Sequence, residues 1–162
     1  MLDDLADLRT RFGKWLKVPA RDERGSMKHP AAWFGRERKP GWLREHEVPP
    51  GHTIKEHVGK TLEDLRQRLA DHPKLPQASS FDSLADAERL VAGVLERRAD
   101  EIERWVEAGA RGRLTLVEEM GERTGTSVLA DGTVFHPTGM RVVLIPDQQA
   151  TSGWRILTSF PD

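Results

Sequence analysis

Two histidines, a lysine and an arginine lie close together in the segment 51–69, at His52, His57, Lys60 and Arg68. A neutral histidine can take a proton from a hydroxyl group, because its ordinary pKa lies near neutral pH. A fixed arginine can stabilise the extra negative charge that builds on the phosphate oxygens during phosphoryl transfer. The segment therefore has side chains suited to acid and base chemistry on a phosphodiester.

The pattern around these residues predicts two short consecutive helices. Ile54 and Val58 are four residues apart and mark the expected buried face of the first helix. His57 directly precedes Val58, so we expect its side chain at the rim of that face, where it would be partly desolvated. Gly59 is placed to end the helix as its C-terminal glycine.

The second helix has a start signal and an apolar stripe. Thr61 with Asp64 three residues later resembles a capping box. Its apolar stripe is formed by Leu62, Leu65 and Leu69. Arg68 stands next to the last of these leucines, so we expect its side chain at the edge of the buried face.

The spacing of the histidines does not predict a metal centre. His52 and His57 are five positions apart, which a single helix does not place on one face, and no HExxH pattern is present. Three other histidines stand in loop or proline-flanked stretches and are expected at the surface: His29, His46 and His72. Neither a glycine-rich phosphate loop nor the nucleophile elbow of a serine hydrolase is found. The remaining chemistry is acid and base catalysis without a metal.

Composition limits the class of protein. The chain has 162 residues, 37% hydrophobic and 31% charged, and a net charge of −1. Such a balance argues against an architectural nucleic-acid binder, whereas a nuclease needs only a local cationic cleft. Because there are no cysteines, disulfides and thiolate metal sites are excluded. We expect no membrane span, since no apolar run is long enough, and the acidic N-terminus does not resemble a signal peptide.

The first 49 residues have a different character from the rest. Apolar residues at helical spacing predict an amphipathic helix over residues 2–17, and many prolines and glycines predict an irregular connector over residues 18–50. Apolar side chains interleaved with basic ones in this connector are Trp33, Phe34, Trp42 and Leu43. They could form a base-stacking arm, but we favour the interpretation that they anchor the segment to the core.

The later part of the chain changes from helical to strand periodicity. Ser83 and Asp86 can cap a long helix with a restart near Asp100, and Gly109 is placed to stop it. Five β-rich runs follow, at 114–117, 127–129, 133–135, 140–145 and 154–160. Asp131 and Gly132 between two of these runs signal a hairpin. Helices followed by strands predict an α+β fold with an antiparallel β-sheet.

Two separated motifs resemble a known family. His57, Val58, Gly59, Lys60 and Thr61, with Arg68 eleven residues after the histidine, form the first motif, and the run 155–161 (RILTSFP) forms the second. Together they resemble the bacterial ribonuclease A-like toxin domain of contact-dependent inhibition proteins and other polymorphic toxins. The resemblance covers roughly residues 50–162. It implies a ribonuclease A-like fold without disulfides over this range, with residues 1–49 as a helix and connector preceding the toxin.

The resemblance also implies an active site. The residues at its positions are His57, Arg68 and Thr158. His57 would act as base or acid, and Arg68 would stabilise charge on the non-bridging oxygens, with Lys60 as a possible second cation. Thr158 would donate a hydrogen bond to the phosphate or to a nucleobase edge.

One position departs from the family. Members commonly end in Thr-x-Tyr, whereas this chain has Phe160 in place of the tyrosine. A phenylalanine can stack on a base but can neither donate nor accept a proton. The second acid or base group is therefore open, and its candidates, in order, are His52, His136 and Lys60.

The function implied by the resemblance is that of a toxic endoribonuclease. It would cleave RNA, with tRNA as the expected target, by metal-independent transesterification to a 2′,3′-cyclic phosphate, and it would need no cofactor. A monomer is expected, delivered as the C-terminal part of a larger toxin into the cytoplasm of a target cell. A cognate immunity protein would block its active site. The alternative is a non-catalytic RNA- or protein-binding module of the same fold, which the missing tyrosine hydroxyl favours.

Overall fold

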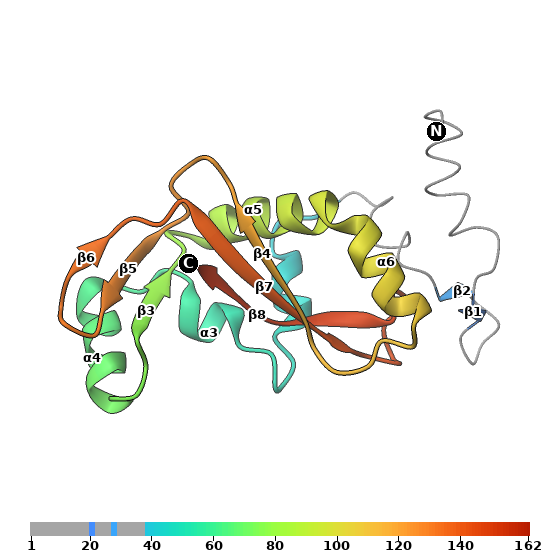
Figure 1. Cartoon of the computed structure of the whole chain (residues 1–162), viewed down its shortest axis with the longest axis horizontal. Coiled ribbons are helices and arrows are strands. Elements are labelled where there is room, and N and C mark those ends of the chain that lie inside the picture. Colours follow the sequence, from blue (N-terminus) through green and yellow to red (C-terminus); the bar gives the residue numbers. More distant parts are fainter. Residues whose placement is uncertain (1–19, 22–26, 29–37) are drawn as a thin grey trace. The chain divides into compact units, whose positions relative to one another are not determined.

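The computed structural model describes residues 20–21, 27–28 and 38–162 (Figure 1). The helix expected over residues 2–17, the side chains of Trp33 and Phe34, and His29 lie outside the described residues. In chain order the elements are β1 (Ala20–Arg21), β2 (Met27–Lys28), the 3-10 helix η1 (Trp42–His46), α3 (Thr53–His57), α4 (Leu62–Asp71), β3 (Gln77–Ser80), α5 (Leu84–Arg97), α6 (Ala99–Glu107), β4 (Leu114–Glu119), β5 (Thr126–Leu129), β6 (Val134–Phe135), β7 (Gly139–Pro146) and β8 (Trp154–Pro161).

The strands form separate antiparallel sheets. The pair β1 and β2 makes one, the order β3-β5-β6 makes a second, and the order β4-β7-β8 makes a third. The α+β class is confirmed, but the strands do not share the single sheet that the order of elements predicts. The reason is that β3 precedes α5 in the chain and pairs with β5, which draws the β5–β6 hairpin into a sheet of its own.

The chain divides into two compact units. Residues 39–94, 115–143 and 156–162 form one unit, and residues 95–114 with 144–155 belong to the other. All of the candidate site residues lie in the first unit. No helix in the described ranges is long and apolar enough to cross a membrane.

The first predicted helix is confirmed as α3, but its buried face is not the expected one. Thr53 and His57 are buried, whereas Ile54 and Val58 are only half-buried. The helix is short, and strand contacts rather than its apolar residues decide its orientation: the Thr53 hydroxyl accepts from Ser159 of β8 at 3.4 Å. His57 is therefore inside the protein and not at the rim. Gly59 follows the helix with φ +66°, a conformation that favours glycine.

The second predicted helix is confirmed as α4, with its capping box. Thr61 and Asp64 exchange hydrogen bonds of 2.9 and 3.1 Å between side chain and backbone. Leu65 is buried against β3 and β5, and Leu69 packs beside it. Leu62 is 39% exposed, so the apolar stripe is shorter than expected. This packing fixes the face of α4 from which Arg68 projects.

The later elements follow the sequence pattern closely. The Ser83 hydroxyl accepts from the Asp86 backbone at 3.1 Å at the start of α5, and the chain restarts as α6 after a break at Arg98. Asp131 and Gly132 form the expected turn between β5 and β6, with φ +93° at the glycine. These predictions are confirmed.

The segment 18–50 is more ordered than the predicted connector in its described part. β1 and β2 pair within it, and η1 lies close to the site. Leu43 is fully buried and Trp42 nearly so, and the buried Glu88 of α5 accepts hydrogen bonds from the backbone of Gly41 and Leu43 at 3.0 and 2.8 Å. Trp42 and Leu43 therefore anchor the chain and do not form an exposed stacking arm.

Candidate active site

His57 is held from two sides by β3 and the residue that follows it. Its carbonyl oxygen accepts from the Phe81 backbone at 2.8 Å, and its ring Nδ1 lies 2.9 Å from the Ser79 carbonyl oxygen. A carbonyl can only accept, so Nδ1 carries the proton and donates. In the neutral ring the lone pair is then on Nε2, which is the atom available to act as a base.

The surroundings of His57 keep it neutral. Its side chain is only 6% exposed, and burial is the main reason that its pKa falls to about 4. The hydrogen bond to Ser79 opposes this effect, and the positive charge of Arg68 adds to the lowering. At neutral pH His57 is therefore in the unprotonated form that a base requires, whereas the sequence alone left base or acid open.

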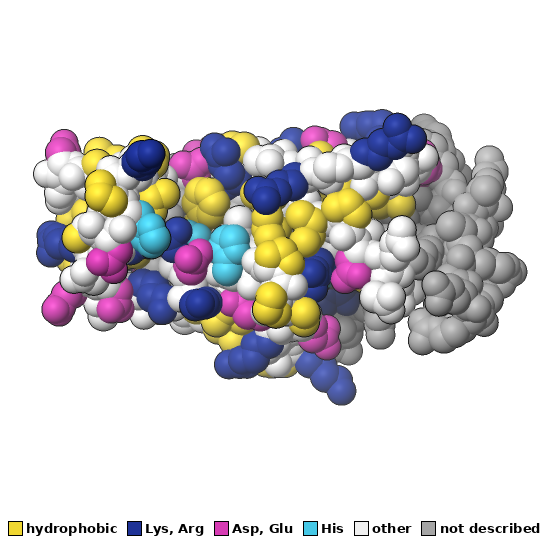
Figure 2. All heavy atoms as spheres, turned by 90° about the horizontal axis from the view of Figure 1, so that it is seen from below, with side chains coloured by type: hydrophobic (Ala, Val, Ile, Leu, Met, Phe, Trp, Pro, Cys, Tyr) yellow, Lys and Arg dark blue, Asp and Glu magenta, His cyan; other side chains and the backbone are white. Residues whose placement is uncertain are grey.

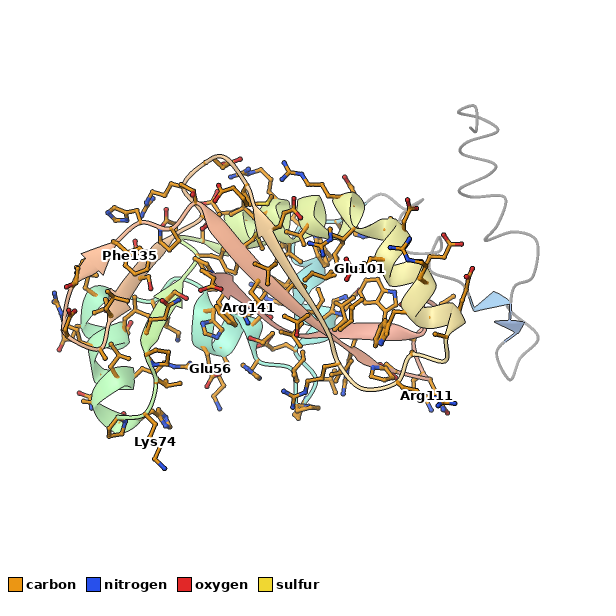
Figure 3. All side chains as sticks on the ribbon, in the orientation of Figure 1. Glu56, Lys74, Glu101, Arg111, Phe135 and Arg141 are labelled. Carbon is orange, nitrogen blue, oxygen red and sulfur yellow. The ribbon has the colours of Figure 1, made fainter. Side chains whose placement is uncertain are left out.

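Glu56, labelled in Figure 3, contacts both His52 and Arg68. One carboxylate oxygen lies 3.3 Å from Nη1 of Arg68, and the other lies 3.4 Å from Nε2 of His52. The ring Nδ1 of His52 donates to the Pro50 carbonyl at 2.9 Å. The two histidine rings are 6.2 Å apart between centroids. Figure 2 shows one face of the molecule, with histidine side chains among acidic and basic ones.

The pairing of His52 with His57 corrects the helical reasoning. His52 is the N-cap of α3, with a φ of −151°, and therefore stands outside the regular helix. Its side chain is not bound by helical spacing and turns toward the same side as His57. The five-residue separation consequently does not keep the two rings apart.

The last strand brings two further residues to the site. The backbone of His52 donates to the Leu157 carbonyl at 2.9 Å, so β8 lies beside α3, as Figure 1 also shows. The Phe160 ring packs on the His57 ring with a centroid distance of 5.0 Å. Thr158 is two residues earlier in the strand and shares that face. Phe160 thus contacts the candidate base directly, in addition to any role in stacking on RNA.

Two buried polar atoms at the site lack a hydrogen-bond partner among the described residues. They are Nε of Arg68 and Oγ1 of Thr158. Buried polar groups are nearly always paired in folded proteins, so an unpaired donor on each of these two site residues needs an explanation, and a bound ligand would supply one. Both atoms can donate to an oxygen of a phosphate group.

Comparison with known proteins places these motifs in a family. Residues 51–161 match the family described as the bacterial CdiA-CT RNAse A domain. The chain belongs to this family. Its structure is similar to a crystal structure of a CdiA-CT/CdiI complex from Y. kristensenii 33638, with a TM-score of 0.64 and 26% sequence identity over 69% of this chain and 99% of that chain. No curated protein matches. The α+β, ribonuclease A-like fold of this toxin domain contains no cysteine.

Two candidates for the second acid or base in this CdiA-CT RNase A domain lie elsewhere. His136 is exposed, and its Nδ1 accepts from Nε of Arg123 at 3.2 Å, so local contacts hold it. Lys60 donates from its backbone to the Ser80 hydroxyl at 3.0 Å, and no contact brings its ammonium to His57 within the described ranges. Of the three candidates, His52 is the one that the structure places beside His57.

The structure also adds residues that sequence reasoning missed. Glu56 is four residues after His52, a helical spacing that could have revealed the pair. No sequence pattern indicates the contact between the Ser79 carbonyl and His57, because the two residues are 22 positions apart in the chain. Arg141 of β7, labelled in Figure 3, places its guanidinium 6.0 Å from the centre of the Phe160 ring.

A further missed residue fixes the start of α3. Glu47 accepts hydrogen bonds from the backbone of Ile54 and Lys55, one on each carboxylate oxygen, at 3.0 and 2.7 Å. This pairing satisfies two of the free N–H groups at the helix start and places a negative charge there. Glu47 therefore helps to orient the short helix that contains both Glu56 and His57.

Proposed function

We propose that this chain is a toxic endoribonuclease that cleaves RNA by transesterification, without a metal, and leaves a 2′,3′-cyclic phosphate. The observation that supports this most directly is the environment of His57: a buried, neutral imidazole whose Nε2 makes no hydrogen bond within the described residues, in a site whose residues Arg68 and Thr158 have unpaired polar atoms. These groups match the needs of a reaction in which the RNA supplies its own nucleophile.

The first half of the reaction uses the base and the cation. Nε2 of His57 takes the proton of the ribose 2′-hydroxyl, and the 2′-oxygen attacks the adjacent phosphorus. Negative charge then grows on the non-bridging oxygens. Arg68 stabilises that charge through its guanidinium, and the Thr158 hydroxyl donates a further hydrogen bond.

His52 supplies the acid for the second half. Nδ1 donates to the Pro50 carbonyl and Nε2 faces the Glu56 carboxylate, an arrangement that the protonated ring satisfies at both nitrogens. Its proton goes to the 5′-oxygen as the bond from phosphorus to that oxygen breaks. With a third of its side chain exposed, His52 can exchange protons with water afterwards. Phe160 has no proton to give, so this assignment replaces the tyrosine of other family members.

The family and the similar complex support a proposed biological setting. The domain acts as the C-terminal part of a larger toxin and cleaves RNA, with tRNA as the expected target, in the cytoplasm of the recipient cell. It works as a monomer until a cognate immunity protein, by analogy with the CdiA-CT/CdiI complex, covers the site. The division into residues 1–49 and the toxin domain 50–162 is part of the same proposal.

The test is RNA cleavage by the purified protein in excess EDTA. We expect cyclic phosphate ends, and we expect His57→Ala and Arg68→Ala to lose cleavage while His136→Ala, a histidine outside the cluster, keeps it. A folded protein that binds RNA and leaves it intact would favour the non-catalytic module instead. Cleavage that disappears with EDTA and returns with a metal would contradict the proposed mechanism.

A further inference from the structure

Three side chains of the site have the geometry of a metal-binding group. One ligand atom each from His52, Glu56 and His57 lies within 4.8 Å of the other two. Nε2 of His52 and Oε2 of Glu56 are 3.4 Å apart, which is close to the distance between two ligand atoms of a zinc ion. Two ligands bound at about 2.1 Å in a tetrahedral zinc site are about 3.4 Å apart. The third ligand atom, from His57, lies within 4.8 Å of the other two.

Both histidines already have the support that metal-binding histidines show. Nδ1 of His52 donates to the Pro50 carbonyl, and Nδ1 of His57 donates to the Ser79 carbonyl, each at 2.9 Å. A histidine that binds a metal usually donates its other ring nitrogen to a carbonyl or carboxylate in this way, which fixes the ring and its tautomer. In both rings the nitrogen left to bind a metal is Nε2.

The ion pair with Arg68 leaves one carboxylate oxygen available. Oε1 of Glu56 faces Arg68 at 3.3 Å, and Oε2 faces His52. Oε2 can therefore bind a cation without breaking the ion pair. The nearby guanidinium will weaken the binding of a dication through charge repulsion, so the site is suited to reversible occupancy.

We propose that His52, Glu56 and His57 bind one Zn²⁺ ion through two imidazole nitrogens and one carboxylate oxygen, with a fourth position open to solvent. Two histidines and a carboxylate are an established ligand set for zinc. The ion would occupy Nε2 of His57, the atom that the proposed ribonuclease reaction uses as its base. This inference rests on the proposed function: because His57 is the base of the reaction, zinc acts as a reversible inhibitor and not as a cofactor.

Binding is tested first, without RNA. Untagged full-length protein is titrated with ZnCl₂ in a calorimeter, beside His52→Ala, Glu56→Gln and the control His72→Ala. His72 is exposed at the end of α4 and outside the cluster. We expect one ion per chain, a loss of affinity of at least tenfold in the first two variants, and no change in the control. Both replaced side chains are about a third exposed, so the variants should fold, which circular dichroism will verify.

The proposed site would be wrong if His52→Ala and Glu56→Gln bound Zn²⁺ with the affinity of the parent protein. It would also be wrong if Zn²⁺ binding disappeared in His72→Ala. The inhibitory role is tested separately by RNA cleavage over a range of ZnCl₂ concentrations. Half-inhibition should occur near the measured dissociation constant, and EDTA should restore the rate. Cleavage that requires zinc would overturn the inhibitory role. Zinc binding as expected in a protein that never cleaves RNA would refute the proposed function and leave the metal site standing.

Discussion

His57 keeps its neutral form far below neutral pH, because burial lowers its pKa to about 4. If neutral His57 is the base, kcat/KM for RNA cleavage should show no loss as the pH falls from 7 to about 5 and should drop only as the pH passes through about 4. Replacing His57 by Ala should lower the rate by about 10² to 10⁴. The measurement is a pH profile of kcat/KM on a short RNA substrate. An acidic limb near the ordinary histidine pKa of 6.5 would assign the base to another group.

The same pKa makes a prediction about stability. The unfolded chain, with a histidine pKa near 6.5, takes up a proton between about pH 6.5 and 4, while folded His57 does not. Acid therefore favours the unfolded state in this window, and the free energy of unfolding should fall by roughly 3 kcal/mol from this residue alone. Urea unfolding of the parent and of His57→Gln at pH 7 and pH 4 isolates the effect, since both share all other titrating groups. Identical pH dependence in the two proteins would contradict the lowered pKa.

Thr158 offers a test in which activity and stability move in opposite directions. Its buried hydroxyl lacks a partner in the described part of the chain, and an unpaired buried hydroxyl destabilises a fold. Thr158→Val should raise the free energy of unfolding by about 1 kcal/mol and lower kcat/KM roughly tenfold or more, because a hydrogen bond to a charged phosphate is lost. Thr158→Ser keeps the hydroxyl and serves as the control for activity. A stable Thr158→Val variant with the parent rate would remove Thr158 from the site.

Only some of the contacts between the site residues could be predicted from the sequence. The spacing of His57 and Arg68 and the family resemblance predict both in one site, and the positive charge of Arg68 contributes to the lowered pKa of His57. The burial of His57 was missed, since it depends on contacts with Ser79 and Phe81, which the local pattern does not reveal. The closeness of the His52 and His57 rings could not be predicted from helical spacing, because His52 is the N-cap and lies outside the regular helix.

At the scale of elements, the short helix α3 depends on residues before it. Glu47 caps its first turn with both carboxylate oxygens. Glu47→Ala should lower the free energy of unfolding by about 1–2 kcal/mol and reduce kcat several-fold, because the helix that holds Glu56 and His57 loses its fixed start. The matched control is Glu45→Ala, an exposed glutamate on η1. Chemical denaturation and cleavage kinetics measure the two effects, and a Glu47→Ala variant that matches the control in both would show that the cap is dispensable.

Element boundaries could be predicted well, but strand pairing other than the β5–β6 hairpin could not. Period and capping residues located α4, α5 and the later strands, because these signals are local: Thr61 with Asp64, and Ser83 with Asp86, mark the helix starts. The residues that pair between β3 and β5 are about 50 positions apart in the chain, as Ala78 and Val128 are. It depends on Leu65 packing against Ala78 and Val128, which no local pattern encodes. The sequence likewise predicts an irregular segment where η1 forms, because the contacts of η1 are with residues far along the chain.

At the scale of the molecule, the contacts of η1 test where the toxin domain begins. The family match starts at residue 51, yet η1 buries Trp42 and Leu43, and His46 Nδ1 accepts from the Ile156 backbone at 3.0 Å. A fragment 51–162 loses these groups. Burial of one large apolar side chain contributes about 1.5–3 kcal/mol, a large part of the 5–15 kcal/mol that stabilises a typical domain.

We therefore expect a fragment 39–162, which keeps η1, to fold and to unfold cooperatively. The fragment 51–162 should melt at least about 10 °C lower, because several kcal/mol are lost at once and each shifts the melting temperature by a few degrees. Calorimetry on both fragments measures the difference, and RNA cleavage at low temperature shows whether the site survives. If both fragments melt together, η1 contributes nothing to stability and the predicted start at residue 50 is adequate. If only the longer one folds, the stable toxin domain includes the anchor and the Glu47 cap that precede the family motif.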